Sequence, residues 1–186
     1  MNRRTLIKQI GLITGATVLG SEFFLSGCTH ADSTTGLYTP KDLAFFDEVA
    51  ETIIPRTSTP GAKDAAVGAF MAHYASDCYD AASQYLLKKG IELINESATS
   101  RYKKGFLALT PTEKEILLTE TDAAAHKYES NKKNENDPPH YFTLLKQLTL
   151  LGFFTSKPGI TQVLRYNPVP GKYEGCIPYN NETSWA

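Results

Sequence analysis

The chain has 186 residues, of which 41% are hydrophobic and 21% are charged, and its formal net charge is −1. This composition is that of an ordinary globular protein, and the length suits one domain with its own core better than two. The near-neutral charge gives no basic surface of the kind that nucleic-acid-binding proteins carry, so we expect no nucleic-acid partner.

The first 27 residues have the pattern of an export signal. Arg3 and Arg4 are followed by the sequence TLIK and then by a run rich in Gly, Ala and Thr, from Ile10 to Leu25. A charged region followed by a modestly apolar one is typical of a signal peptide, and the paired arginines resemble a twin-arginine (Tat) export signal. This signal implies the Tat translocase as a partner, a route associated with proteins that are exported already folded.

The apolar run ends in LSGC, at Cys28, and this ending resembles a bacterial lipobox. Signals of this type are cleaved before the cysteine, which then carries a lipid. The alternatives are a plain signal peptide with a chance cysteine and an uncleaved anchor helix. A pair of acyl chains suffices for stable anchoring, because each buried CH2 group contributes about 0.8 kcal/mol. We therefore predict that Cys28 anchors the chain in the bacterial cell envelope, facing the periplasm, and that 28–39 form a flexible tether.

The remainder, 40–186, is predicted to be one helical domain. Thr39 is suited to cap a helix, Pro40 to begin it and Asp42 to lie in its first turn. Pro55 ends it, because the residue before a proline is pushed away from the helical conformation. Between these signals, apolar residues recur at intervals of three and four, as on the buried face of an amphipathic helix. They are Leu43, Phe46, Val49, Ala50, Ile53 and Ile54.

Four further helices are expected over about 64–78, 81–105, 111–128 and 140–154. Gly90 weakens the prediction of the helix over 81–105 near its middle, since glycine disfavours helix interiors. Thr110 and Glu113 form a capping-box pattern at the start of the helix over 111–128. No run of alternating polarity is long enough to indicate a strand. The predicted fold class is all-α, a single small domain of about five helices with an irregular, Pro/Gly-rich C-terminal segment.

That segment includes GFFTSKPGITQVLRYNPVPGKYEGCIP, residues 152–178, which its prolines and glycines prevent from being one helix. Two roles are predicted for it together. It wraps the domain's own helices, where proline rigidity lowers the entropy lost on ordering, and it forms part of a docking surface. For Arg165, binding of an anion or a partner's carboxylate and a structural role toward loop carbonyls both stay open. The candidate partner interface consists of residue types favoured at interfaces: Phe153, Phe154, Arg165, Tyr166 and Tyr173.

Two cysteines remain once Cys28 is assigned to the lipid. Cys78 and Cys176 are candidates for a disulfide in an oxidising compartment, where closing a loop of about 100 residues contributes about 4 kcal/mol on the chain-entropy model. Free, buried thiols and a bridge from one cysteine to a partner chain are the alternatives.

The sequence has no motif for a catalytic, cofactor or metal site. It contains no HExxH, no CxxC or CxxCH, and no G-x-S-x-G. The glycine-rich stretch GLITGATVLG lies inside the predicted signal peptide, outside the strand–turn–helix context that a nucleotide loop needs. We therefore expect no catalytic, cofactor-binding or metal-binding residue in this chain.

Two stretches carry a family resemblance. IIPRTSTPGA, at 53–62, resembles a motif near the start of the gluconate 2-dehydrogenase subunit 3 family. The motifs LKQLTL, GFFTS, LRY, PVPG and GC between Phe142 and Cys176 are similar to that family's C-terminal half, as is the ending SWA. The resemblance spans nearly the whole chain after the signal peptide and is least informative over about 80–132.

The resemblance implies a non-catalytic small subunit of a membrane-associated, flavin-dependent sugar or sugar-acid dehydrogenase. In such complexes the large subunit is a flavoprotein of the glucose–methanol–choline oxidoreductase type, which holds FAD and performs the chemistry. A cytochrome c with several haems often accepts the electrons. The small subunit typically brings the export signal, with which the paired arginines agree, while the lipobox makes this chain the anchor as well.

Two other hypotheses belong to different classes of function. A stand-alone envelope lipoprotein that binds a ligand or acts as a scaffold would be a stable monomer without large exposed apolar patches. An enzyme in its own right would show dehydrogenase activity without any partner.

Overall fold

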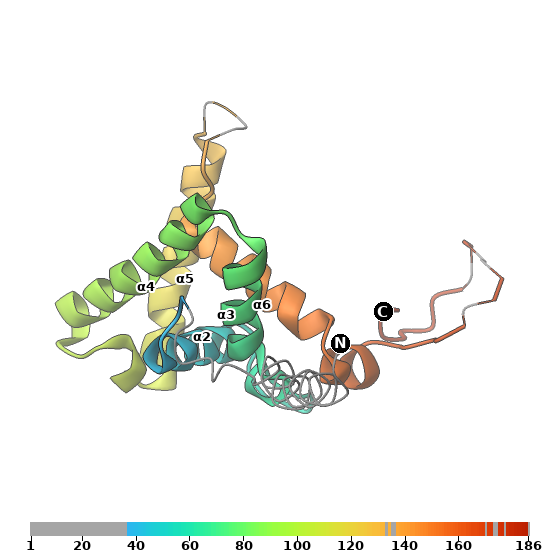
Figure 1. The fold of residues 1–186 in the computed structure, drawn as a ribbon. Helices are drawn as coiled ribbons and strands as arrows, with labels where there is room; N and C mark the ends of the chain where they lie inside the picture. The colour runs from blue at the N-terminus through green and yellow to red at the C-terminus, as the bar shows by residue number, and fades with distance from the viewer. Residues whose placement is uncertain are drawn as a thin grey trace, which may run out of the picture. The chain divides into compact units, whose positions relative to one another are not determined.

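The structure is a computed structural model of the chain, and it describes residues 37–132, 134, 137–169, 171–172, 175–176 and 178–185. The predicted export signal with Arg3 and Arg4, the lipidation site Cys28 and most of the predicted tether lie outside the described residues. As predicted, the described part is all-α, with five α-helices and no β-strand (Figure 1). None of these helices is long and apolar enough to cross a membrane.

The first of these helices is α2, Pro40–Ile53, and its start confirms the predicted capping signal. The Thr39 hydroxyl accepts a hydrogen bond from the Asp42 backbone N–H at 3.3 Å, and the Asp42 carboxylate accepts one from the Thr39 N–H at 2.8 Å. This capping box satisfies backbone donors that a helix start leaves unpaired. The buried face of α2 consists of Phe45, Phe46, Val49 and Ala50.

The second predicted helix begins three residues later than expected. Residues Lys63–Ala65 form a 3-10 turn, and α3 spans Val67–Cys78. Ala66 between them has a φ of 51°, in the left-handed region, which interrupts the helix. The turn is tied to α2, because the Lys63 N–H donates to the Glu51 carboxylate at 2.8 Å. A tertiary contact therefore sets the start of α3.

Helix α4 spans Ala81–Tyr102 and continues through Gly90 without a break. A Cβ atom at Gly90 would lie 2.7 Å from Cδ2 of Tyr141, so the glycine allows α4 and α6 to approach closely. Helix α5 spans Pro111–Ser130 and begins with the predicted capping box of Thr110 and Glu113. Both helices begin where the sequence predicted, while α4 ends three residues before the predicted 105.

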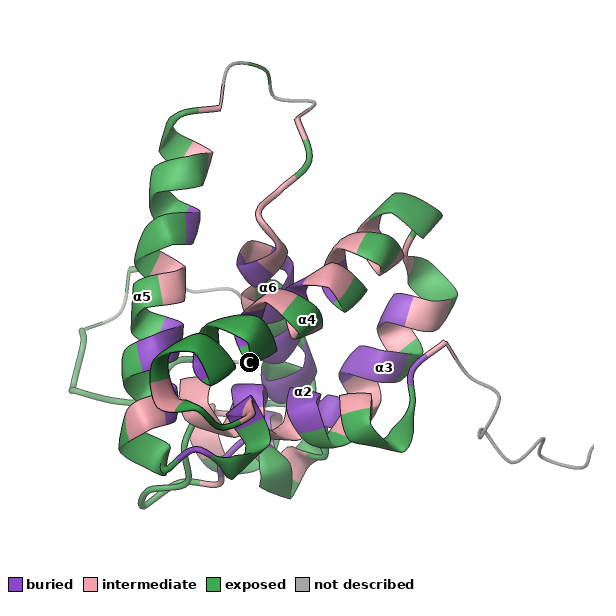
Figure 2. Cartoon of the chain, turned by 90° about the vertical axis from the view of Figure 1, so that its left-hand side faces the viewer, coloured by how far each residue is buried: buried purple, intermediate pink, exposed green. Residues whose placement is uncertain are grey.

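Helix α6, Tyr141–Phe154, lies at the centre of the domain and contacts α2, α3, α4 and α5. Figure 2 shows the buried residues on the faces that these helices turn toward one another, while the last turns of α5 are mostly exposed. The largest fully buried side chains come from several helices and from the turn before α5: Phe46, Met71, Phe106, Phe142, Leu145 and Phe153. Burial of such side chains supplies most of the stabilising free energy of a domain of this size.

After α6 the chain makes a π-helical turn, Gly159–Val163, and then contains no further helix among the described residues. Val163 still packs against the core. From Tyr166 to Trp185, every described residue is exposed. The prediction that the C-terminal segment wraps the domain's own helices is therefore wrong for the described residues beyond Arg165, because all of them are exposed.

Candidate functional site

One candidate site is an apolar surface at the end of α6. Leu150, Leu151 and Phe154, which we call the α6 patch, are 39%, 39% and 40% exposed. They occupy positions i, i+1 and i+4 of α6, on the side that the neighbouring helices leave uncovered. A helix on a protein surface ordinarily carries polar residues at such positions, so an exposed apolar cluster there indicates an interaction surface.

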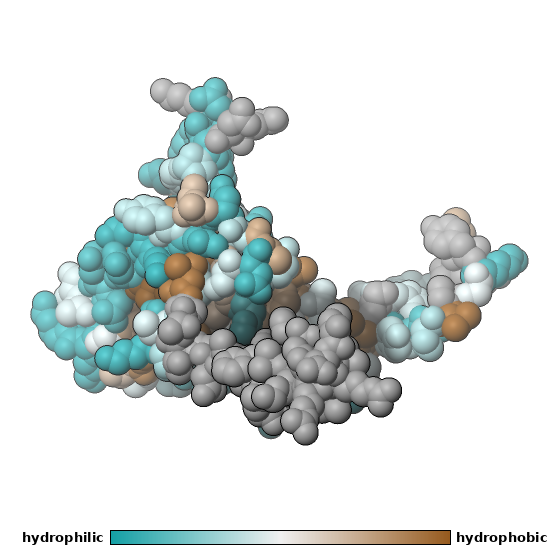
Figure 3. Space-filling model, viewed as in Figure 1, coloured by the Kyte–Doolittle hydropathy of each residue, from teal (hydrophilic) through white to brown (hydrophobic). Residues whose placement is uncertain are grey.

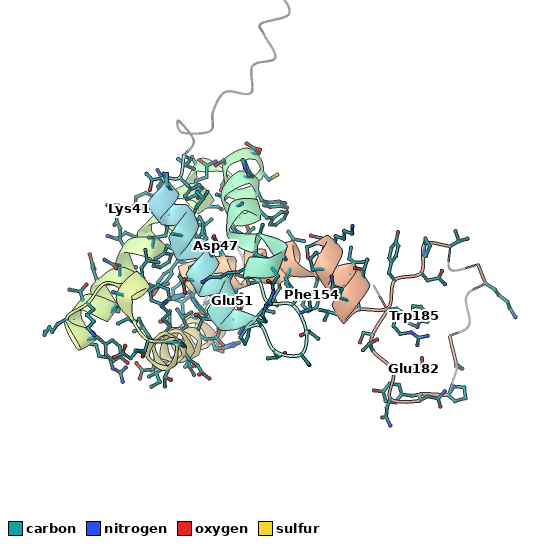
Figure 4. The ribbon with its side chains drawn as sticks, turned by 90° about the horizontal axis from the view of Figure 1, so that it is seen from below. Lys41, Asp47, Glu51, Phe154, Glu182 and Trp185 are labelled. Carbon is teal, nitrogen blue, oxygen red and sulfur yellow. The ribbon has the colours of Figure 1, made fainter. Side chains whose placement is uncertain are left out.

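The second part of the site is the C-terminal loop, which we define as residues 165–185. The Arg165 N–H donates to the Ser184 carbonyl oxygen at 2.9 Å, and Arg165 forms an isolated parallel bridge with Trp185. The Arg165 guanidinium lies 3.9 Å from the centroid of the Trp185 ring and forms an ion pair with Glu182. Figure 4 shows Glu182 and Trp185 on this loop and Phe154 at the end of α6. Arg165 therefore joins the two ends of the loop.

The Arg165 guanidinium pairs with a carboxylate of its own chain, which is neither of the two roles that the sequence left open, and both of those roles stay predictions. Large apolar side chains are nevertheless exposed along the loop. The most exposed are Val169 and Tyr179, at 77% and 79%, and Tyr166 and Trp185 are exposed as well. Figure 3 shows apolar residues both on the loop and where it joins the helices. The α6 patch and the C-terminal loop follow one another in the chain and share this character.

The residues of the predicted partner interface differ in how far they are exposed. Phe153 is only 1% exposed and belongs to the core, so its side chain is not available to a partner in this structure. Phe154 stacks edge-on against it, with ring centroids 5.3 Å apart, and is exposed on its outer side. Tyr166 is exposed, Arg165 is partly buried, and Tyr173 lies outside the described residues. Sequence reasoning did not single out the exposed apolar residues Leu150, Leu151, Val169, Tyr179 and Trp185.

The two cysteines proposed for a disulfide are both free and exposed in the structure. Pairing of Cys78 with Cys176 stays a prediction.

The IIPRTSTPGA motif forms the loop between α2 and the 3-10 turn, and carboxylates fix its backbone. Oε1 of Glu51 accepts from the Arg56 N–H at 2.9 Å, and Oδ2 of Asp64 accepts from the Gly61 N–H at 2.8 Å and from Nε of Arg56 at 2.7 Å. Figure 4 shows Asp47 and Glu51 on the side of α2 that faces this loop. A Cβ atom at Gly61 would lie 2.6 Å from the Arg56 nitrogen, so only glycine fits there. This motif therefore has a structural role within the domain.

A groove of about 400 Å³ lies beside this loop and is lined by Glu48, Lys63 and Lys114 among others. The Glu48 carboxylate accepts from Nζ of Lys63 at 2.5 Å and from Nζ of the buried Lys114 at 2.8 Å. Burial alone raises the pKa of the Glu48 carboxyl, but hydrogen bonds from Lys114 and Lys63 outweigh burial and hold the pKa below its ordinary value of 4.5. The one carboxylate is thus shared between two lysines, which is typical of a structural ion-pair network.

Across the part of the chain that the structure describes, no group of three or more His, Cys, Asp and Glu side chains is arranged to hold a metal ion.

Comparison with known protein families finds one match. The family described as gluconate 2-dehydrogenase subunit 3 matches residues 40–171, from the first residue of α2 into the C-terminal loop. Comparisons with curated proteins and with solved structures gave no match. The matched range includes the carboxylate-fixed loop, all five helices and the α6 patch.

Proposed function

The chain belongs to the gluconate 2-dehydrogenase subunit 3 family, and from this premise we propose that it is the accessory subunit of a flavin-dependent sugar or sugar-acid dehydrogenase. Its partner is a large subunit of the glucose–methanol–choline type, which holds FAD and performs the oxidation. A cytochrome c subunit receives the electrons. In this complex the chain escorts the large subunit through the Tat translocase, stabilises it and anchors it by a lipid on Cys28.

The observation that carries the proposal is the apolar surface that this member of the family exposes. The α6 patch and the C-terminal loop together leave three side chains of α6 and four of the loop uncovered. Aromatic and large aliphatic residues are enriched at the centres of protein–protein interfaces, where they provide most of the binding free energy. A stand-alone lipoprotein would gain nothing from exposing them.

Cell fractionation tests the escort and the anchor. Substituting Arg3→Lys and Arg4→Lys should leave the flavin-dependent dehydrogenase activity in the cytoplasm, because the large subunit depends on this chain for export. Cys28→Ser should move the exported activity from the membrane fraction or abolish processing of the signal peptide, because the lipid is lost.

Thr29→Ala, next to the lipidation site, serves as the matched control and should leave the distribution unchanged. Activity that reaches the envelope normally with both arginines substituted would contradict the escort role. Activity that stays on the membrane after Cys28→Ser would contradict the lipid anchor.

A further inference from the structure

We propose that the C-terminal loop is a docking element that is closed before binding by a lock between Arg165 and Trp185, and that it enters an apolar, aromatic-lined groove of the large subunit. This inference rests on the proposed function and adds to it the segment that docks, the residues that shape it and the chemistry of the surface that receives it.

The lock consists of three interactions on one residue. The Arg165 backbone N–H bonds the Ser184 carbonyl oxygen, the guanidinium lies over the Trp185 ring, and the same guanidinium pairs with Glu182. Arg165 lies two residues after Val163, which packs against the core. The lock therefore fastens the far end of the loop to the point where the loop leaves the domain.

The loop between these ends is exposed rather than folded onto the domain. Its described residues form no helix or strand, and all of those from 166 to 185 are exposed. Pro168 and Pro178 restrict its backbone, and Tyr166, Val169 and Tyr179 extend into solvent. A segment that contains prolines and carries exposed aromatic side chains has the composition of peptides that dock into aromatic-lined grooves.

The charge of the loop indicates what kind of groove it fits. Residues 165–186 contain two cations, Arg165 and Lys172, and two anions, Glu174 and Glu182, so their net charge is zero. The lock pairs one cation with one anion. A neutral segment that exposes four large apolar side chains fits an apolar groove better than a charged surface. Its binding should therefore depend only weakly on ionic strength.

The advantage of the lock is preorganisation. A loop held at both ends has fewer conformations than a tail held at one end, so less conformational entropy is lost when a partner orders it. Breaking the lock should therefore weaken binding even where none of the contact residues changes. We expect Arg165→Ala to reduce the affinity for the large subunit about tenfold.

Trp185 is the only tryptophan of the chain and reports on the lock directly. In the isolated chain, Arg165→Ala should expose the Trp185 ring and so increase the quenching of its fluorescence by acrylamide. Arg165→Lys should act in the same direction, because lysine keeps a charge for Glu182 but lacks the planar face that stacks on the ring. Since these residues lie outside the core, the melting temperature of the helical domain should not change.

The decisive experiment measures the affinity of the purified chain for the flavoprotein for the wild type, Arg165→Ala, Arg165→Lys and Tyr85→Ala. Tyr85 is an exposed aromatic residue on α4 and serves as the matched control. We expect weaker binding for both Arg165 variants, unchanged binding for Tyr85→Ala and less than about a threefold change between low and high salt.

An Arg165→Ala variant with increased quenching of Trp185 and unchanged affinity would overturn the lock, while leaving the proposed function intact. A strong salt dependence would overturn the apolar groove. If the wild-type chain does not bind the flavoprotein at all, both the inference and the proposed function fail.

Discussion

His140 caps α6 with a side chain that changes charge near neutral pH. Its Nδ1 atom accepts a hydrogen bond from the Phe142 N–H at 3.2 Å, which only the neutral ring can do. Burial lowers the pKa of His140 below its ordinary value of 6.5, although Glu129 acts in the opposite direction. The unfolded chain therefore takes up a proton at a higher pH than the folded chain does. It follows that the stability contributed by His140 is present above pH 6.5 and is lost as the pH falls through the folded pKa.

His140→Asn tests this dependence, because asparagine also caps helices but does not titrate. We expect the melting temperature to fall less between pH 7.5 and pH 5.5 in the variant than in the wild type, as measured by circular dichroism. The other histidines are the same in both proteins, so the difference isolates His140. Equal decreases in the two proteins would show that the cap does not titrate in this range.

At the scale of the elements, the α6 patch should bind the partner without supporting the fold. Leu151→Ala with Phe154→Ala should weaken complex formation at least tenfold, since central apolar residues of an interface commonly contribute more than about 1 kcal/mol each. The melting temperature should fall by a few degrees only, because both side chains are about 40% exposed, although Phe154 also packs against Phe153. Affinity measurement of the double variant against the wild type checks the first point, and thermal unfolding checks the second.

Ile116→Ala provides the control for the patch, since Ile116 is 41% exposed on the separate helix α5. It should leave the affinity unchanged. Equal weakening by Ile116→Ala and by the patch variant would indicate a loss of general surface hydrophobicity, and the patch would then have no special role.

Local rules predicted the helices well wherever local interactions set their bounds. Thr39 with Asp42, and Thr110 with Glu113, satisfy their own helix starts, so a short stretch of sequence contains all the necessary information. The start of α3 could not be predicted in this way. It depends on Glu51, twelve residues before Lys63, whose N–H it accepts.

Which face of an element is buried was harder to predict than the element itself. Phe153 and Phe154 are neighbours at the end of a largely apolar helix, and the sequence alone does not say which of them meets the core. Packing of four helices around α6 decides it, burying Phe153 and leaving Phe154 exposed. In the same way, Gly68 looks like a weak helix residue in the sequence. In the structure a Cβ there would lie 2.3 Å from Oδ1 of Asp47, so the close approach of α2 to α3 requires glycine.

In the whole molecule, the packed helices provide stability, while the α6 patch and the C-terminal loop provide the exposed apolar surface. Carboxylates of α2 fix the loop that leads to α3, and α6 holds the core together from its centre. The uncovered apolar surface lies at the end of α6 and in the segment that follows it. A domain built in this way can be stable by itself and still offer a partner a large apolar surface, as an accessory subunit needs to do.

The most direct test of the central claim is to purify the affinity-tagged chain from detergent-solubilised membranes and to record the absorption spectrum and the dehydrogenase activity of the product. We expect a large subunit in a fixed ratio to this chain, a flavin spectrum and sugar or sugar-acid dehydrogenase activity, with neither flavin nor activity in the chain expressed alone. A tagged chain that is recovered from the envelope as a monodisperse, flavin-free monomer, or one that is active without any partner, would contradict that claim.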